Sequence, residues 1–298
     1  MRIARRNLVL FIFIVGLLIA CIYYLFVMNK AIKPAEYQTE RVIRYGFVIE
    51  NNTSELIVDS ELQAFLPLAK TPFQKRQTID VNLAYKTSAD SFGNEKLAVT
   101  LPNLPPYGST QVVVTVKLSL ASKPNFFELW HTDERFLRDE KFIEVSNTQI
   151  SKTANSIQSD HKQTPLSSAL HEWVALNIKN QGYIAQNLGA LYALTHKKGD
   201  CTEYAYALTA LARNSGIPAV PVAGFALTNQ SAVLHPSDYH NWAYLFEKDE
   251  WVFSDPMKNI YNTHAEYHIV FNVLNEESLE ANSQRFFSAD PRLNIRML

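Results

Sequence analysis

Apolar residues alternate with polar ones in the first half of this chain and recur at helical spacing in the second. This change of period limits the folds open to it. Between residues 41 and 122 the alternation has a period of two, which indicates short, half-buried strands separated by turn-forming clusters. The clearest alternating runs are residues 43–49, 79–85 and 112–120. The pattern predicts a small β-sandwich over about residues 41–122.

A helical period begins after a bridging segment that is rich in aromatic and charged residues. Apolar residues at helical spacing occupy residues 150–157, 166–178, 188–194 and 201–216. Strand-like runs follow at residues 220–227, 241–246, 251–253 and 267–273. Helices followed by strands predict an α+β domain in which helices pack on an antiparallel sheet.

The N-terminal segment predicts a membrane anchor. Residues 8–28 carry no charge, and a helix of that length spans roughly 30 Å, about one hydrocarbon core. Three arginines precede this run and favour a cytoplasmic N-terminus, with residues 31–298 on the other side of the bilayer. Two alternatives stay open: a lipoprotein that is lipidated at Cys21, and simple secretion after cleavage.

These patterns divide the chain into four parts. We expect a membrane anchor at residues 1–30, a β-sandwich at 31–125, a bridging segment at 126–149 and an α+β domain at 150–298. The expected fold class is α+β: a helix-and-sheet core preceded by a small β-sandwich and a transmembrane helix.

The charge balance excludes one broad class of partner. The chain has 28 Lys and Arg residues against 29 Asp and Glu, a formal net charge of −1 without a basic stripe, so we expect no nucleic-acid partner. His235 and His240 lie five residues apart, which suits neither a helical nor a strand metal pair, and no acidic loop suggests calcium. We expect no metal and no cofactor.

Cys201 is a candidate nucleophile because of its place on a predicted helix. Asp200 is a good N-cap, Glu203 completes a capping box, and Gly216 supplies the C-terminal stop. The free N–H groups of the first turn favour an anion, so we expect them to lower the pKa of the thiol and to stabilise an oxyanion on a substrate. A buried core cysteine is the alternative.

His240 and Asp255 lie on the two arms of a predicted hairpin. The polar turn at residues 248–249 predicts that Glu247 pairs with Glu250. In this register Asp255 is the diagonal neighbour of His240 on the same face, within reach of a hydrogen bond. A turn one residue longer would put the two side chains on opposite faces. A thiolate, an imidazole and a carboxylate in this order can form a catalytic triad.

Three separated motifs carry a family resemblance. The first runs over residues 199–204 (Gly-Asp-Cys-Thr-Glu-Tyr) with 211–213 and 216–219, the second over 239–242 (Tyr-His-Asn-Trp) and the third over 251–256 (Trp-Val-Phe-Ser-Asp-Pro). In this order they resemble the cysteine, histidine and aspartate motifs of the transglutaminase-like superfamily of papain-like thiol enzymes. The similarity covers about residues 150–275, and the chain resembles a bacterial, membrane-anchored member. It departs from many members at Val220, where they have Arg.

The resemblance implies roles for three residues. Cys201 matches the nucleophile, His240 the base and Asp255 the acid that orients the imidazole. Further candidates for oxyanion or substrate contacts are Tyr183, Asn187, Glu203 and Asn241.

The expected activity is acyl transfer on amide bonds of peptides or proteins through a Cys201 thioester, with hydrolysis favoured. The expected place is the periplasmic side of a bacterial cytoplasmic membrane, with a peptide or protein of the cell envelope as substrate and the bilayer contacted through residues 8–28. Two alternatives stay open: a Gln–Lys cross-linking transglutaminase and a non-catalytic interaction module of the envelope.

Overall fold

The computed structural model describes residues 37–127, 130, 133–227, 233–276 and 286–298. Among the helices of these residues, none combines the length and the apolar character needed to span a bilayer. The predicted anchor, residues 8–28, lies outside the described residues, so the membrane-spanning helix stays a prediction.

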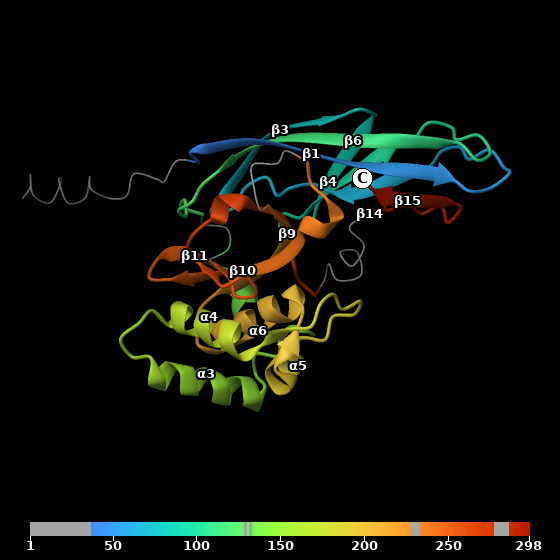
Figure 1. Cartoon of the computed structure of the whole chain (residues 1–298). Helices are drawn as coiled ribbons and strands as arrows, with labels where there is room; N and C mark the ends of the chain where they lie inside the picture. The colour runs from blue at the N-terminus through green and yellow to red at the C-terminus, as the bar shows by residue number, and fades with distance from the viewer. Residues whose placement is uncertain (1–36, 128–129, 131–132, 228–232, 277–285) are drawn as a thin grey trace, which may run out of the picture. The chain divides into compact units, whose positions relative to one another are not determined.

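Two antiparallel sheets form the predicted sandwich, with strand orders β15-β1-β6-β3 and β14-β2-β5-β4 (Figure 1). Their strands are β1 (Thr39–Asn51), β2 (Glu61–Phe65), β3 (Gln74–Val81), β4 (Tyr85–Ala89), β5 (Glu95–Thr100), β6 (Ser109–Leu120), β14 (Phe286–Phe287) and β15 (Leu293–Met297). Alternate residues of β1, such as Ile43 and Ile49, are fully buried against apolar residues of β2, β5 and β6. Two antiparallel sheets with a shared apolar core thus occupy the range where the period of two predicts a sandwich.

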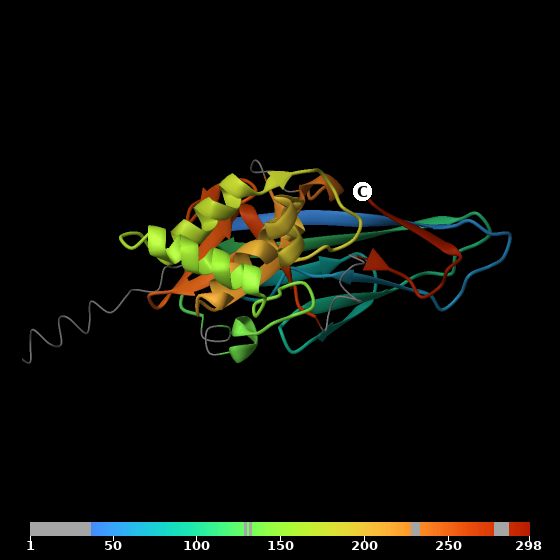
Figure 2. The same cartoon turned by 90° about the horizontal axis from the view of Figure 1, so that it is seen from below.

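The C-terminal segment returns to the sandwich, although the sequence pattern assigns it to the α+β domain. Strand β15 pairs with β1, where Phe47 lies opposite Met297, and β14 pairs with β2. Figures 1 and 2 both show this red segment beside the strands of the sandwich. The reason is that β1 and β2 would otherwise be open sheet edges, which the short C-terminal strands cover. The predicted range 150–298 thus contains strands of both sandwich sheets.

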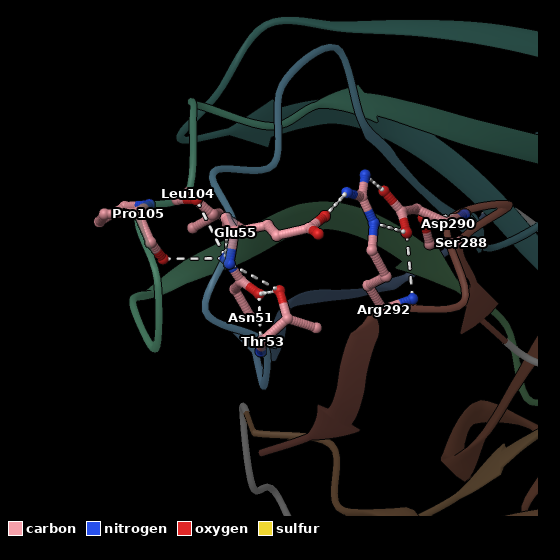
Figure 3. Close-up of polar contacts among 8 residues, drawn as sticks. All are labelled: Asn51, Thr53, Glu55, Leu104, Pro105, Ser288, Asp290 and Arg292. Carbon is pink, nitrogen blue, oxygen red and sulfur yellow. Dashed lines mark hydrogen bonds and ion pairs between the residues drawn. The ribbon is translucent and has the colours of Figure 1, made fainter.

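Polar contacts hold this segment against the turn that follows β1 (Figure 3). The guanidinium of Arg292 pairs with Asp290 at 2.6 Å and with Glu55 at 3.4 Å. The turn itself is fixed by Asn51, whose Oδ1 accepts from Thr53 and whose Nδ2 faces three backbone carbonyl groups. These carbonyls belong to Glu55, Leu104 and Pro105.

The second half of the chain folds as helices on a sheet, as predicted. The sheet is antiparallel with strand order β12-β11-β10-β9-β13. Its strands are β9 (Ala219–Ala226), β10 (Tyr239–Glu247), β11 (Glu250–Asp255), β12 (Ile260–Tyr261) and β13 (His268–Val273). The helices are α3 (Thr148–Asp160), α4 (Leu166–Asn177), α5 (Ala190–His196) and α6 (Cys201–Asn214).

Short elements complete this half. A parallel pair, β7 (Lys179–Asn180) and β8 (Lys198–Gly199), was not predicted from the sequence. Three single-turn 3-10 helices are η1 (Glu134–Leu137), η2 (Pro236–Asp238) and η3 (Ala265–Tyr267). Strand β8 leads directly into α6, so the pair fixes the chain just ahead of Cys201.

Both faces of the five-stranded sheet are covered. On one face α6 packs against β9 and β10, with Ala223 and Leu245 in the shared core. On the other face Trp242 and Tyr244 pack against sandwich residues such as Phe73. Figures 1 and 2 show the helices and the sandwich on opposite sides of this sheet. This arrangement buries most of β10 and β11, including His240 and Asp255, between two apolar layers.

Candidate active site

The N-terminus of α6 is built by the predicted capping box. Asp200 Oδ1 accepts from the backbone of Thr202 at 2.8 Å, and Glu203 Oε2 accepts from the backbone of Asp200 at 3.1 Å. Gly199 makes this possible, because a Cβ atom there would lie 2.3 Å from the Cβ of Glu203. Cys201 is therefore the first residue of the helix, as predicted.

The thiol of Cys201 lies beside strand β10. The backbone amide of Asn241 donates to the sulfur, and Asn241 Nδ2 donates to Thr202 Oγ1 at 2.9 Å. Cys201 is a free, half-buried cysteine. Its own amide belongs to the first helical turn, where N–H groups have no partner within the helix. The oxygen of an acyl group whose carbon is bound to the sulfur could accept a hydrogen bond from this amide.

The hairpin has the register that the sequence predicts. Strands β10 and β11 pair Glu247 with Glu250 and Ala243 with Ser254. The two turn residues, Lys248 and Asp249, both have positive φ angles of 55° and 63°, as a two-residue hairpin turn requires. His240 and Asp255 consequently meet, and His240 Nε2 lies 2.7 Å from Asp255 Oδ2. This bond leaves Nδ1 as the ring nitrogen for a thiol.

Asp255 is a fully buried carboxylate that is held ionised. Burial alone raises the pKa of Asp255, but hydrogen bonds from His240 and His268 outweigh it and bring the pKa well below its usual range. Its second oxygen, Oδ1, accepts from the backbone of Lys258 at 3.1 Å. Three N–H groups thus fix the carboxylate, which in turn fixes the imidazole of His240.

The electrostatics of Cys201 correct one expectation. Burial, followed by the charge of Asp200, raises the pKa of the Cys201 thiol to about 12, and Glu203 and Asp255 act in the same direction. The backbone N–H of Asn241 opposes the rise without cancelling it. On balance the pKa of the resting thiol is therefore raised, and not lowered as its place at the helix N-terminus predicts. The sulfur needs a base to take its proton when it attacks.

The other predicted candidates lie around the same helix end. Tyr183 is 87% exposed and Asn187 is half-buried, both on the loop that follows β7. Two acidic side chains hold this loop: Asp200 Oδ2 accepts from the backbone of Ile184, and Glu203 Oε1 from that of Leu188, each at 2.9 Å. Because Glu203 is fully buried and both its oxygens accept backbone N–H groups, its contacts are structural.

Asn241 is the candidate nearest to the sulfur. Its Nδ2 is bonded to Thr202, while its buried Oδ1 has no hydrogen-bond partner in the described part of the chain. The Thr202 hydroxyl can donate or accept, so the amide can take either orientation.

Two buried histidines escaped the sequence analysis. His268 Nε2 lies 3.3 Å from Asp255 Oδ2, the oxygen that His240 also contacts. His171 Nδ1 bonds Ser254 Oγ at 2.8 Å, next to Asp255 in strand β11. Both histidines lie in runs whose apolar residues alone account for the helical and strand periods, so the pattern gives no sign of a site there. Only the pairing of distant elements shows where their rings meet the site.

In the described ranges, no three His, Cys, Asp or Glu side chains lie close enough together to hold a metal ion.

The direct contact between the Cys201 sulfur and the His240 ring stays a prediction. What the geometry provides is a bonded His240–Asp255 pair whose neighbour, Asn241, contacts the cysteine.

The comparisons with known proteins agree with this arrangement. Residues 151–256, which include Cys201, His240 and Asp255, match the family model described as the transglutaminase-like superfamily. No curated protein matches the chain.

Two solved structures match the chain, and the first of them is similar in fold. A protein from Cytophaga hutchinsonii described as a "putative cysteine protease" has 12% identity and a TM-score of 0.54, over 87% of this chain and 92% of that chain. The periplasmic domain of TgpA from Pseudomonas aeruginosa has 16% identity and a TM-score of 0.39, over 73% of this chain and 88% of that chain. The first similarity extends over the sandwich as well as the core.

Proposed function

Because residues 151–256 carry a transglutaminase-like domain, we propose that this chain is a cysteine-dependent acyl-transfer enzyme acting on amide bonds of peptides or proteins. The observation that carries the proposal is the 2.7 Å bond between His240 Nε2 and Asp255 Oδ2, on a hairpin whose next residue contacts Cys201. Burying a carboxylate costs free energy unless a partner compensates its charge. Here the partner is an imidazole, and we propose that its other nitrogen, Nδ1, faces the thiol.

In the first step His240 Nδ1 takes the proton of Cys201 as the sulfur attacks the amide carbonyl carbon. A C–S bond forms, and the carbonyl π pair moves to the oxygen as an oxyanion. When this intermediate collapses, the C–N bond breaks and the imidazolium gives its proton to the leaving amine, which leaves a thioester on Cys201. Asp255 stabilises the imidazolium in between.

The raised pKa of Cys201 fits this order of events. The resting thiol is protonated, so the thiolate exists only together with the imidazolium. Once the proton has moved, a cation on His240 and the N–H groups of the α6 N-terminus both stabilise the sulfur anion. Proton transfer and attack are therefore coupled.

Two donors are proposed for the oxyanion. The first is the backbone amide of Cys201, at the open end of α6. The second is the side chain of Asn241, turned so that its Oδ1 accepts from Thr202 and its NH₂ group faces the reacting carbonyl. The exposed Tyr183 and the half-buried Asn187 lie on the adjoining loop, where they could contact the substrate.

In the second step we propose that water attacks the thioester. His240 accepts a proton from the water, a C–O bond forms, and the C–S bond breaks to return the thiol. A lysine amine in place of water would form a cross-link. We favour water because it is abundant at the proposed location, the periplasmic side of a bacterial cytoplasmic membrane, with residues 8–28 as the anchor.

The alternative is a non-catalytic interaction module of the envelope. The raised pKa of Cys201 favours it, since an inert buried cysteine would show the same shift. In such a module the His240–Asp255 bond would serve the fold alone.

The test is the change in mass of envelope peptides that are incubated with the purified full chain. Hydrolysis of a peptide bond adds the mass of a water, and cross-linking removes that of ammonia. We expect the gain of water, and its loss in Cys201→Ser. Thioester chemistry is ruled out if Cys201→Ser processes the same peptides at the wild-type rate. Peptides that stay unchanged with both proteins would favour the non-catalytic module.

A further inference from the structure

His268 meets the same oxygen atom as His240. Its Nε2 lies 3.3 Å from Asp255 Oδ2, and its Nδ1 lies 3.1 Å from the backbone carbonyl oxygen of His264. The ring is 3% exposed, so water does not complete either contact. In sheet order β13 is separated from β11 by two strands, and the contact therefore links opposite parts of the sheet.

Both partners of the His268 ring are acceptors. A carbonyl oxygen accepts only, and an ionised carboxylate accepts only. A neutral imidazole has one N–H group, so it satisfies one of the two, and the charged oxygen of Asp255 is the stronger acceptor. A doubly protonated ring satisfies both. The number of hydrogen bonds that His268 makes therefore depends on its proton.

The groups around His268 are few. Among the described residues, the titratable groups that act on His268 are Asp255 on β11 and His240 on β10, whose ring centroid lies 6.4 Å from that of His268. Phe253 and Trp242 pack against the ring at centroid distances of 4.6 and 5.0 Å and carry no charge. Burial lowers the pKa of His268, Asp255 raises it, and a charged His240 lowers it. The two histidines thus compete for one carboxylate.

We propose that His268 is a positioning residue of the active site. It holds Asp255 Oδ2 in place for His240, and the two histidines share the negative charge of this carboxylate. The proposal rests on the proposed function of His240 as the base. With one proton, His268 donates to Asp255 and leaves its negative charge to act on His240. With a second proton, His268 adds a positive charge behind Asp255 and offsets the negative charge that acts on His240. Protonation of His268 therefore weakens the action of Asp255 on His240.

The contact itself can be tested without any catalysis. The imidazole resonances of His268 are followed against pH by NMR in the full chain and in Asp255→Asn. Loss of the carboxylate should lower the pKa of His268 by about one unit or more, because the opposite charge that favours the imidazolium is gone. An unchanged titration would show that Asp255 does not act on His268, and would overturn the proposal whether or not the chain is an enzyme.

The positioning role is tested on the alkylation rate of Cys201 by iodoacetamide, measured against pH at the Cys201 peptide. His268→Gln keeps one donor but cannot titrate, whereas His268→Phe fills the aromatic site without a donor. We expect the rate to fall about tenfold in His268→Phe and to stay within about threefold in His268→Gln. On the acid side of the pH profile (the acid limb), the slope of the logarithm of the rate against pH should correspond to one proton fewer in His268→Gln than in wild type.

His171→Gln is the matched control, because His171 is about as buried and hydrogen-bonds Ser254 and Asn259, so that it meets Asp255 only through its charge. It should lower the melting temperature without changing the slope of the acid limb. The proposal is wrong if both His268 variants keep the wild-type slope, even when their melting temperatures fall. Should His268→Phe fail to fold, the slope in His268→Gln decides alone. Wild-type Cys201 that reacts no faster than free cysteine would count against the proposed function, while the NMR titration still decides the contact.

Discussion

Asp255→Asn removes a single charge from the candidate site and leaves its size unchanged. Asp255 is surrounded by three N–H groups, from His240, His268 and the backbone of Lys258. An asparagine has one acceptor oxygen and an NH₂ group that only donates. If the oxygen keeps the bond to Lys258, the NH₂ group faces Nε2 of His240 and forces the proton to Nδ1. The imidazole then has no lone pair for the thiol.

The expected loss follows from the pKa of Cys201. With a pKa of about 12, roughly one thiol in 10⁵ is ionised at pH 7 unless a base takes the proton. Proton transfer to His240 can therefore be worth up to this factor. Other triads that lose the orienting acid lose on the order of 10⁴ in turnover. We expect Asp255→Asn to slow reaction at Cys201 by about 10⁴. The fold should persist because no cavity forms, but the melting temperature should fall at neutral pH because the stabilising charge of Asp255 is lost.

The assay is the alkylation rate of Cys201 at neutral pH, with thermal unfolding measured alongside. Asp249→Asn is the matched control, since Asp249 is exposed in the turn of the same hairpin and its positive φ of 63° suits asparagine. It should react like wild type. If Asp255→Asn kept nearly the wild-type rate, the carboxylate would have no role, and the site would reduce to a Cys–His pair.

Three further predictions concern stability. Gly224→Ala should cost about 3 kcal/mol or more in thermal unfolding, because its Cβ would lie 1.9 Å from the carbonyl oxygen of Ile269; a wild-type Tm would contradict this close approach. Arg213→Ala should cost about 3 to 5 kcal/mol in denaturant unfolding, since it leaves Glu140 without its 2.7 Å partner; a loss below 1 kcal/mol would show that the pair is solvated. Because folding lowers the pKa of Asp255, its charge stabilises the fold above about pH 4, and this contribution should disappear on acidification. The difference in stability between wild type and Asp255→Asn should therefore shrink at low pH, and a difference that grows would contradict the direction of the pKa shift.

The hairpin and the helix cap could be predicted because both depend on residues close in sequence. A two-residue turn fixes which residues pair, and the pairing fixes which side chains share a face. The register of Glu247 with Glu250 therefore placed Asp255 beside His240 without tertiary information. In the same way, the capping box of Asp200 and Glu203 determined that α6 begins at Cys201.

The pKa of Cys201 could not be predicted from its helix position. The residues that cap the helix, Asp200 and Glu203, also bring negative charge near the sulfur, and Asn241 of β10 contacts it. A helix N-terminus supplies partial charges, whereas a nearby carboxylate supplies a full one in a medium of low polarity. Burial depth and the distance to Asp255 depend on how the sheet packs, which local sequence does not contain.

The roles of His268 and of the C-terminal strands depend on contacts between residues far apart in sequence. His268 reaches Asp255 only because β13 joins the sheet next to β9, with a register shift between Val270 and Asn272. Strand β15 pairs with β1 across nearly the whole length of the chain. Periodicity predicts that such strands exist, but it does not say which edge they join.

The central claim is that His240 activates Cys201, and one rate measures it most directly. That rate is the alkylation of Cys201 by iodoacetamide at pH 7, compared with a free cysteine peptide and with His240→Ala. Paired with an imidazolium, the thiol should react about tenfold faster than the peptide, because ordinary cysteine is only a few per cent thiolate at this pH. His240→Ala should remove this advantage. A buried thiol with a pKa of about 12 and no base would instead react on the order of 10³ times slower than the peptide, and that result, unchanged in His240→Ala, would contradict the account.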